Sequence, residues 1–323
     1  MFSIPASWRT PALLILLPFF FTARRLLRTP LRTAKLAPIA ERVLIIGASS
    51  GIGQSIAHIY AKRGARVCVV GRREKNIEEV ATECRLRVLG GDDKRILGVA
   101  ADFADVDDMI RVRTLLETEW NGLDTLIIVA GVSALQPLMA VAGVEAHGTS
   151  FTPREADRDG LQRAVDVSAA AVRGNYTGPL VAAIAFIPLL QRTSPSPSVL
   201  LLNSLASVIP APTRSIYAST KSASLLLFQA LSIEHPSIAF SHILPATVEG
   251  DFRASAVDGG PVREKDPNKS GLKREYVADR CVLAVDRREK TVFMPWAMRP
   301  AHFLYWIWPS YVERMAREKY NFN

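Results

Sequence analysis

Tyr217, Lys221 and Ser204 have the side-chain types and the spacing that proton-transfer chemistry requires. Tyr217 and Lys221 stand four positions apart, so on a helix they would share one face. A phenol is a poor acid at neutral pH, but an adjacent ammonium group favours the phenolate and lowers the pKa of the phenol. Ser204 lies 13 positions before Tyr217 and offers a hydroxyl group to a substrate carbonyl. The set predicts a proton donor aimed at an oxygen atom while a nicotinamide delivers a hydride.

A glycine-rich turn lies between an expected strand, Val43–Ile46, and an expected helix, Gln54–Arg63. Its residues are Gly47, Ala48, Ser49, Ser50, Gly51, Ile52 and Gly53. Glycines let the backbone bend tightly and approach a pyrophosphate, whose charge is favoured by the N-terminus of a helix. Because the turn stands in the required strand–turn–helix context, it predicts a dinucleotide phosphate site rather than a purely structural turn.

Two arginines, Arg72 and Arg73, follow the end of the second expected strand, Arg66–Val70. A carboxylate at this place would hold the ribose hydroxyls of NAD and repel a 2′-phosphate. Guanidinium groups pair well with phosphate, so the pair predicts a preference for NADP(H). The alternative is a solvated pair of charges at the start of the next helix, Glu74–Arg85.

Short apolar runs alternate with helical stretches through the body of the chain. Beyond the two strands above, the runs are Ile96–Ala101, Thr125–Val129, Val199–Asn203 and Ala239–Leu244. Such alternation is typical of right-handed βαβ units whose parallel sheet is covered on both faces. We therefore expect one α/β domain, a Rossmann-type doubly wound parallel sheet, over residues 41–292. Residues 249–275 are rich in glycine, proline and charge and are expected to form a long excursion, of the kind that often covers a site.

The glycine turn, the serine and the Y-x-x-x-K pair, in this order, resemble the classical short-chain dehydrogenase/reductase family. The resemblance covers roughly residues 42–250 and is to the membrane-associated 11β-hydroxysteroid dehydrogenase type. It implies that Asn175 is a fourth catalytic residue, which holds a water for proton relay. It also implies that Asp102 contacts the adenine, that Tyr217 and Lys221 contact the cofactor, and that the chain forms a homo-oligomer.

The segment after the sixth strand also resembles the family. Pro245-Ala246-Thr247-Val248 corresponds to the family's P-G-x-V segment near the nicotinamide, with alanine in place of glycine. The resemblance adds Pro245, Thr247 and Val248 to the expected cofactor-binding residues.

The chain departs from the family after the fourth strand, where it has Ile128-Val129-Ala130-Gly131 in place of N-N-A-G. Ala130 and Gly131 remain expected cofactor contacts, but both asparagine side chains are absent. This loss of a polar network favours an alternative hypothesis, a non-catalytic NADP(H)-binding membrane scaffold or regulator. The intact serine, tyrosine and lysine oppose that alternative. They are also left unexplained by a third hypothesis, a tethering protein that uses both apolar ends.

The first 40 residues are expected to be a membrane anchor or targeting segment with a basic flank. Pro11–Ala23 is apolar and uncharged, but a comfortable bilayer crossing needs roughly 20 residues. Residues 1–40 hold no acidic side chain and six basic ones: Arg9, Arg24, Arg25, Arg28, Arg32 and Lys35. These account for six of the net charge of +9, which indicates contact with anionic lipid rather than nucleic acid. The alternatives are a mitochondrial presequence, a cleaved signal or a soluble apolar helix.

An anchor of this kind predicts attachment to the endoplasmic reticulum membrane with the catalytic domain in the cytosol, because the basic flank follows the apolar segment. A reducing compartment fits the cysteines, Cys68, Cys84 and Cys281, which are scattered and show no disulfide or zinc spacing. We expect them to be small buried hydrophobic residues, and we expect no metal site.

The last 31 residues, 293–323, form an expected aromatic extension. Phe303–Trp308 is followed by a charged helical stretch, Val312–Lys319. Bulky aromatics flanked by arginine and lysine are typical of a membrane interface or of the mouth of a hydrophobic site. Packing against the body of the protein or a second subunit is the alternative. The substrate expected beside a bilayer is a lipophilic ketone or alcohol, such as a steroid, a sphingoid, a fatty acyl ketone or a retinoid.

Overall fold

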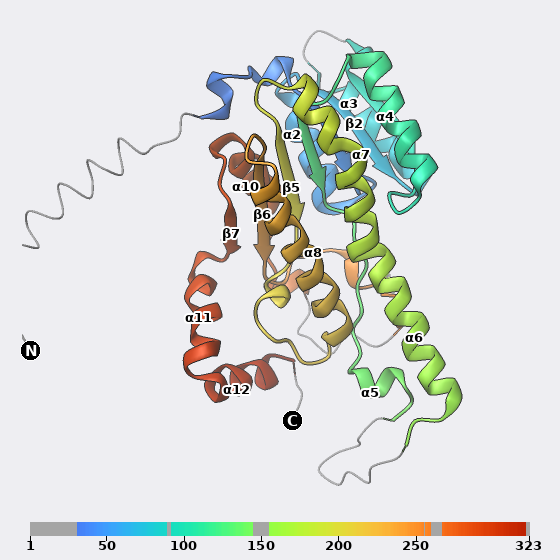
Figure 1. Cartoon of the computed structure of the whole chain (residues 1–323), viewed down its shortest axis with the longest axis vertical. Coiled ribbons are helices and arrows are strands. Elements are labelled where there is room, and N and C mark those ends of the chain that lie inside the picture. Colours follow the sequence, from blue (N-terminus) through green and yellow to red (C-terminus); the bar gives the residue numbers. More distant parts are fainter. Residues whose placement is uncertain (1–30, 89–91, 145–154, 255, 260–266, 321–323) are drawn as a thin grey trace, which may run out of the picture.

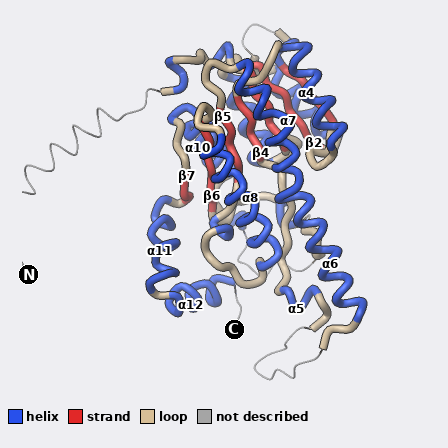
Figure 2. The backbone as a smooth tube through the Cα atoms, in the orientation of Figure 1, coloured by secondary structure: helices blue, strands red, loops and turns tan. Residues whose placement is uncertain are grey.

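The protein is built on one seven-stranded, all-parallel β-sheet. The computed structural model describes residues 31–88, 92–144, 155–254, 256–259 and 267–320. The strands run in the spatial order β3-β2-β1-β4-β5-β6-β7 (Figures 1 and 2). They are Arg42–Ile46 (β1), Arg66–Gly71 (β2), Ile96–Ala100 (β3), Thr125–Ile128 (β4), Ser198–Leu202 (β5), Ala239–Pro245 (β6) and Thr291–Met294 (β7). The doubly wound α/β fold expected from the sequence is confirmed.

The strands are apolar on both faces because each face of the sheet is covered by helices. In β1, Val43 and Ile45 contribute to one core, while Leu44 and Ile46 contribute to the other. Ile45 is paired with Val69 of β2 on one side and with Ile127 of β4 on the other. Since successive side chains point to opposite faces, a continuous apolar run is the sequence pattern that such a strand requires.

Three helices cover each face of the sheet. On one face these are α2 (Gly51–Lys62), α3 (Glu74–Arg85) and α10 (Arg274–Arg287). On the other they are α4 (Val106–Trp120), α7 (Gly178–Thr193) and α8 (Ser215–Glu234), which lie together in Figure 1. The three cysteines are buried and free, as expected: Cys68, Cys84 and Cys281.

One long helical rod carries a π-helical turn in its middle. Helix α6 (Arg158–Val172) runs into the π-turn Arg173–Thr177 and then into α7, and its outer half extends beyond the sheet beside α5 (Leu138–Val141) (Figure 2). A single π-turn inside an α-helix often marks a functional site. Here it contains Asn175, which the resemblance assigns to proton relay.

The chain before β1 is bound to the domain by a buried ion pair. Arg32 is 1% exposed, and its side chain contacts Glu41 and donates hydrogen bonds to the Ser196 carbonyl and to Thr125 Oγ1, at 2.8 and 2.7 Å. The sequence placed Arg32 in a basic flank available to lipid, and the structure corrects that assignment. Its charge is neutralised inside the protein. Residues 1–30, which hold the apolar segment, lie outside the described residues.

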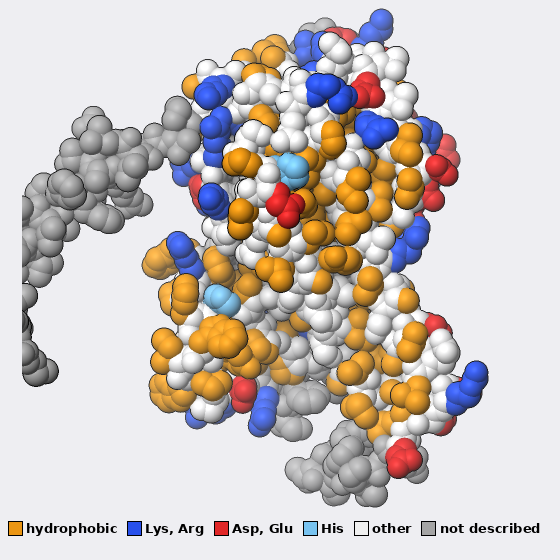
Figure 3. All heavy atoms as spheres, viewed as in Figure 1, with side chains coloured by type: hydrophobic (Ala, Val, Ile, Leu, Met, Phe, Trp, Pro, Cys, Tyr) orange, Lys and Arg blue, Asp and Glu red, His pale blue; other side chains and the backbone are white. Residues whose placement is uncertain are grey.

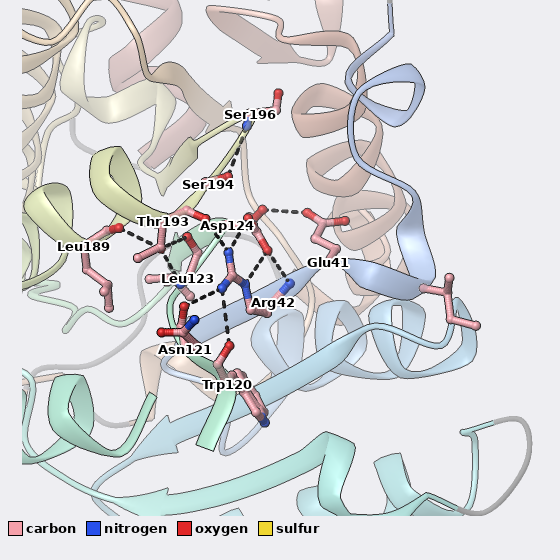
Figure 4. Close-up of polar contacts among 12 residues, drawn as sticks. Glu41, Arg42, Trp120, Asn121, Leu123, Asp124, Leu189, Thr193, Ser194 and Ser196 are labelled. Atoms are coloured by element: carbon pink, nitrogen blue, oxygen red, sulfur yellow. Dashed lines mark hydrogen bonds and ion pairs between the residues drawn. The ribbon is translucent and has the colours of Figure 1, made fainter. Parts of the chain in front are cut away.

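A second ion pair closes the same amino-terminal edge of the sheet. Figure 4 shows Arg42 and Asp124 facing each other, with Nε 2.8 Å from Oδ2 and Nη2 2.9 Å from Oδ1. The Arg42 guanidinium also donates to the carbonyls of Asn121 and Thr193, each at 2.8 Å. This bidentate pair fixes the starts of β1 and β4 relative to each other.

The last two helices, α11 (Arg299–Ile307) and α12 (Pro309–Tyr320), lie beyond the carboxyl end of β7 (Figure 1). They pack on the loop after β5, where His302 Nδ1 lies 2.9 Å from the Val208 carbonyl oxygen. β7 extends to Met294, so the first two residues of the expected extension belong to the sheet. No helix in the described part of the chain is both long and apolar enough to span a membrane.

Candidate active site

The expected site residues meet at the carboxyl edge of the sheet. The glycine turn follows β1, Ala130 and Gly131 follow β4, Ser204 follows β5, and Pro245 ends β6. Because β1 and β4 are neighbours while the chain leaves them in opposite directions along the sheet, a crevice for ligand is expected between their ends.

The glycine turn is shaped for close backbone approach. Gly47 has φ +94°, and a side-chain carbon there would lie 2.4 Å from the backbone nitrogen of Ala130. A side-chain carbon at Gly53 would lie 2.2 Å from the Gly47 carbonyl oxygen. Helix α2 therefore starts at Gly51, three residues earlier than expected, and directs its N-terminus to the crevice.

Arg73 lies across this turn. Its Nη2 donates to Ser49 Oγ and to Ser50 Oγ, each at 2.9 Å, although most of its side chain is exposed. Arg72 is exposed beside it. The structure thus places one of the two arginines directly on the turn that is expected to hold phosphate.

Asp102 follows β3, and its carboxylate is already paired. Partial burial alone would raise the pKa of Asp102, but the Ala104 N–H and the Arg173 guanidinium lower it below its ordinary value. Arg173 Nη2 donates to Asp102 Oδ2 at 2.8 Å. Since Arg173 begins the π-turn that contains Asn175, this pair links the expected adenine end of the site to the proton-relay residue.

Tyr217 and Lys221 lie on the buried face of α8, as their spacing predicted. Lys221 Nζ donates to the Leu202 carbonyl at the end of β5, at 3.2 Å. Burial lowers the pKa of Lys221 to about 8, because the interior disfavours its charged form. An amine in this state remains mostly protonated at neutral pH, and Lys221 lies four positions after Tyr217 on the same helix.

Ser204 is held at the end of β5 by Asn203, a residue that the sequence reasoning missed. Asn203 Oδ1 accepts from the Ser204 N–H at 2.8 Å, and its Nδ2 donates to the Lys221 carbonyl at 3.0 Å. Asn203 therefore ties the strand that carries the serine to the helix that carries Tyr217. The available signal was an amide side chain directly after four apolar strand positions, 199–202.

Asn175 points from the π-turn into the site. It is fully buried and hydrogen-bonds both backbone groups of Val132, and its Nδ2 also donates to Thr220 Oγ1 at 3.0 Å. A side-chain carbon at Gly131 would lie 2.8 Å from Asn175 Oδ1 and 3.2 Å from Lys221 Nζ. Gly131 is thus the position at which the β4 loop, Asn175 and Lys221 converge.

The Pro245–Val248 segment is braced from two sides. The Ala246 N–H donates to the Met294 carbonyl at 2.7 Å, and the Thr247 carbonyl accepts from the Leu272 N–H at 2.9 Å. The Thr247 carbonyl oxygen is thereby engaged with the 249–275 excursion, which the sequence did not foresee. The expected contacts of Pro245, Thr247 and Val248 with a cofactor stay predictions.

The excursion after β6 lies over Tyr217. The Phe252 ring meets the Tyr217 ring edge-on, with 6.2 Å between centroids, and Arg214 lies 5.0 Å from the centre of the same ring. Neither residue was singled out from the sequence, because their contacts depend on loops that only the folded chain brings together.

Comparison with known proteins identifies the family. The family profile described as short chain dehydrogenase matches residues 41–259. The chain belongs to the short-chain dehydrogenase family. It is therefore an oxidoreductase by family, and its expected resemblance is confirmed.

Relatives of this family member carry hydroxysteroid dehydrogenase names. It is 30% identical to 11-beta-hydroxysteroid dehydrogenase A of Sesamum indicum over 66% of this chain, and it spans 54% of that protein's length. It is 30% identical to 11-beta-hydroxysteroid dehydrogenase-like 4A of Arabidopsis thaliana, over 73% of this chain and 71% of that protein. It is 26% identical to the Hydroxysteroid 11-beta-dehydrogenase 1-like protein of Gallus gallus, over 87% of each chain.

Solved structures share the fold at lower identity. An alcohol dehydrogenase from Thermococcus sibiricus, complexed with 5-hydroxy-NADP, superposes with a TM-score of 0.60 at 21% identity, over 78% of this chain and 94% of that one. A short chain dehydrogenase from Bacillus anthracis gives 0.62 at 18% identity, over 80% and 95%.

Proposed function

We propose that this family member is an NADP(H)-dependent oxidoreductase that interconverts a ketone and a secondary alcohol on a lipophilic substrate. The observation that carries the proposal is the buried Tyr217–Lys221 pair at the same edge of the sheet as the glycine turn. Proton transfer and dinucleotide binding need separate residue sets. Here the glycine turn follows β1 and the set Ser204, Tyr217 and Lys221 follows β5, with β4 lying between these two strands.

NADP(H) is favoured by the position of Arg73 on the glycine turn. A guanidinium group bonded to Ser49 and Ser50 needs only to exchange hydroxyl partners to reach a 2′-phosphate. Gly47 and Gly53 lie too close to neighbouring backbone to carry a side chain, so neither position holds one that would keep a pyrophosphate away. When bound, the cofactor supplies the hydride for carbonyl reduction.

The remaining steps belong to side chains of this chain. Ser204 Oγ orients the substrate carbonyl, and Tyr217 donates the proton to its oxygen. Lys221 stabilises the phenolate that forms, and it is itself fixed by the Leu202 carbonyl. Asn175 and Thr220 form a buried hydrogen-bonded pair behind Tyr217 and Lys221. From this end of the site a proton would return to the Tyr217 phenolate.

A lipophilic substrate is supported by the surroundings of Tyr217 and by the names of the relatives. Tyr217 belongs to an apolar cluster with Ala134, Val141 and Ile216, against which Val257 packs. The relatives are named hydroxysteroid dehydrogenases. Steroids and other lipophilic ketones are therefore the first substrates to assay.

Binding of NADPH and NADH to the purified full chain, measured by fluorescence, tests the cofactor. Arg72→Ala together with Arg73→Ala is expected to weaken NADPH binding and leave NADH binding unchanged. Equal weakening of both cofactors would refute the phosphate role. A variant with Arg111→Ala and Arg113→Ala, on α4, is the matched control for loss of two positive charges.

Turnover of a panel of lipophilic ketones tests the chemistry. Tyr217→Phe is expected to abolish NADPH oxidation while the dissociation constant for NADPH stays within a few-fold. Undiminished turnover would remove the catalytic assignment. Tight NADPH binding with no turnover by the unmutated chain on any ketone would instead support the non-catalytic scaffold, which Ile128 and Val129 favour because they replace the family's asparagines.

We further propose attachment to the endoplasmic reticulum membrane, with the aromatic helix α11 as one contact. Phe303, Trp306, Ile307 and Trp308 are all more than half exposed. Figure 3 shows hydrophobic side chains gathered over α11 and α12. Import into mitochondria is the alternative, and imaging of the full chain with compartment markers separates the two.

A homo-oligomer is supported by exposed apolar side chains on α6. Leu161, Val165 and Val172 are 58, 60 and 41% exposed and recur at helical spacing, so they form one stripe. A second copy of the chain would cover this stripe. Sedimentation of the full chain and of Leu161→Glu with Val165→Glu is expected to show an oligomer and a monomer, respectively. A monomer in both samples would contradict the proposal.

A further inference from the structure

A buried cation, Arg214, directly precedes helix α8 and lies next to Tyr217. Arg214 is 5% exposed, and its guanidinium carbon is 5.0 Å from the centre of the Tyr217 ring. Its Nη1 donates to Ser133 Oγ at 3.0 Å, and Ser133 is itself fully buried. A buried guanidinium group is rare because its removal from water costs free energy. Contacts inside the protein must therefore compensate for the burial of Arg214.

The backbone before Arg214 is strained into place. Thr213 has φ +64°, a left-handed conformation that is unfavourable for a β-branched residue, and its side chain is buried. The Arg214 N–H then donates to the Ala211 carbonyl at 3.2 Å, while its own carbonyl accepts from the Ala218 N–H at 2.7 Å. Strain of this kind persists only where the surrounding structure imposes it, and it gathers at functional sites.

Arg214 directly precedes α8, three positions before Tyr217, and Lys221 lies four positions after Tyr217 on the helix. The phenol therefore has a cation on either side along α8. The two cations differ, because a guanidinium group stays charged at every accessible pH whereas a buried ammonium group can lose its proton. A cation near an aromatic ring attracts the phenolate more strongly than the neutral phenol.

Other charged side chains on elements packed around Tyr217 are committed elsewhere. Arg253 Nη1 lies 3.5 Å from the Val248 carbonyl oxygen. Asp258 accepts through Oδ2 from the backbone N–H groups of Leu135 and Gln136, at 2.5 and 2.8 Å. Arg214, in contrast, has its guanidinium carbon 5.0 Å from the centre of the Tyr217 ring.

We propose that Arg214 is a positioning residue for the Tyr217 proton donor. Its permanent charge favours the phenolate, and its bond to Ser133 holds the guanidinium against the ring. This inference rests on the proposed role of Tyr217, which is why its first test does not require turnover.

The first test is the near-ultraviolet absorbance of the phenolate during a pH titration. Subtracting the Tyr217→Phe spectrum from that of the unmutated chain isolates the ionisation of Tyr217. In an Arg214→Met background, the same subtraction is expected to show ionisation at higher pH. Arg63→Met is the matched control, because it removes a guanidinium 5.4 Å from the ring of Tyr60 on α2, away from the site. Identical Tyr217 titrations in the Arg214→Met and unmutated backgrounds would overturn the proposal.

The second test is turnover. Arg214→Met is expected to lower kcat about tenfold or more and to leave the dissociation constant for NADPH within about two-fold. It is also expected to shift the pH–rate profile to higher pH. Arg214→Lys keeps a cation and is expected to recover much of the loss. A purely structural role predicts equal losses in the lysine and methionine variants with no shift of the profile.

Ser133→Ala keeps the charge and removes its anchor, so it serves if Arg214→Met does not fold. The ionisation of Tyr217 is then expected to move to higher pH by less than in Arg214→Met, and an unchanged ionisation would contradict the proposal. The absorbance test also separates two failures. If the unmutated chain reduces no ketone but Tyr217 still ionises at higher pH without Arg214, only the proposed reaction fails.

Discussion

Asn175 forms a two-point hydrogen bond with the backbone of Val132: Oδ1 accepts from the N–H at 2.9 Å, and Nδ2 donates to the carbonyl at 3.0 Å. This contact holds the loop after β4 against the π-turn. The loop begins after Ile128, and Ile128 and Val129 stand at the positions where the resemblance places the family's two asparagines. Asn175 therefore supplies polar support at a place where Ile128 and Val129 cannot.

Replacement of Asn175 by alanine is expected to lower both stability and turnover. It leaves the partly buried Val132 N–H and carbonyl without their partner, which should reduce the free energy of unfolding by about 1–3 kcal/mol. Urea denaturation and kcat measure the two effects. Gln162→Ala, on the exposed side of α6, is the control and should change neither. A normal kcat in Asn175→Ala would remove the residue from the proton-relay assignment.

Lys221 is expected to make stability depend on pH. Its pKa is about 8 in the folded protein and 10.5 ordinarily, so above pH 8 the folded state binds fewer protons than the unfolded state. Lys221 by itself should therefore add about 1 kcal/mol to the free energy of unfolding between pH 8 and 9. Lys221→Met should lose this rise, as measured by urea denaturation at each pH.

Over the same pH range the three buried cysteines oppose the effect, because burial raises the pKa of each thiol to about 12 from an ordinary 9.0. The unfolded state then loses protons first, and stability falls in both proteins. The test is therefore the difference in free energy of unfolding between the two proteins at each pH from 8 to 9, in which this common loss cancels. Parallel stability curves for the two proteins in that range would contradict the burial-based shift of Lys221.

The Arg32–Glu41 pair is expected to control whether shortened chains fold. Both side chains are 2% exposed, so Arg32→Met leaves a buried carboxylate unpaired and should lower the free energy of unfolding by about 3–5 kcal/mol. Adding Glu41→Leu should recover most of the loss. A chain that starts at residue 31 should fold like the full chain, whereas one that starts at residue 41 should be unstable. Equal urea midpoints for these two chains would refute the role of the pair.

Exposed residues of α11 are expected to bind lipid. Phe303→Ser with Trp306→Ser should reduce co-sedimentation with vesicles that contain anionic lipid, because aromatic rings are favoured at the membrane interface. The assay uses the chain from residue 31, so that the first 30 residues do not contribute. Leu226→Ser with Ile233→Ser, exposed on α8 at 68 and 81%, is the control. Equal vesicle binding by the two variants would mean that α11 has another partner.

The sequence by itself determined the local elements. Continuous apolar runs such as Val43–Ile46 can only be satisfied by a strand that is buried on both faces, and each strand expected from such a run lies within one residue of its observed bounds. The glycine turn and the Tyr217–Lys221 spacing were equally clear, because each depends on residues that are close in the chain. The same holds for the burial of the cysteines.

Tertiary structure alone decided which distant residues complete the site. Val132 and Asn175 are 43 positions apart, Ser133 and Arg214 are 81 apart, and Arg32 and Ser196 are 164 apart. No local sequence pattern predicts such a contact, because the sequence around a polar residue is the same whether its side chain is solvated or bonded to a distant residue. Arg32 looked like part of a lipid-binding flank and is a buried ion pair. Arg214 belonged to no motif in the sequence and lies against the ring of Tyr217, since the partners of both arginines are set by the path of the whole chain.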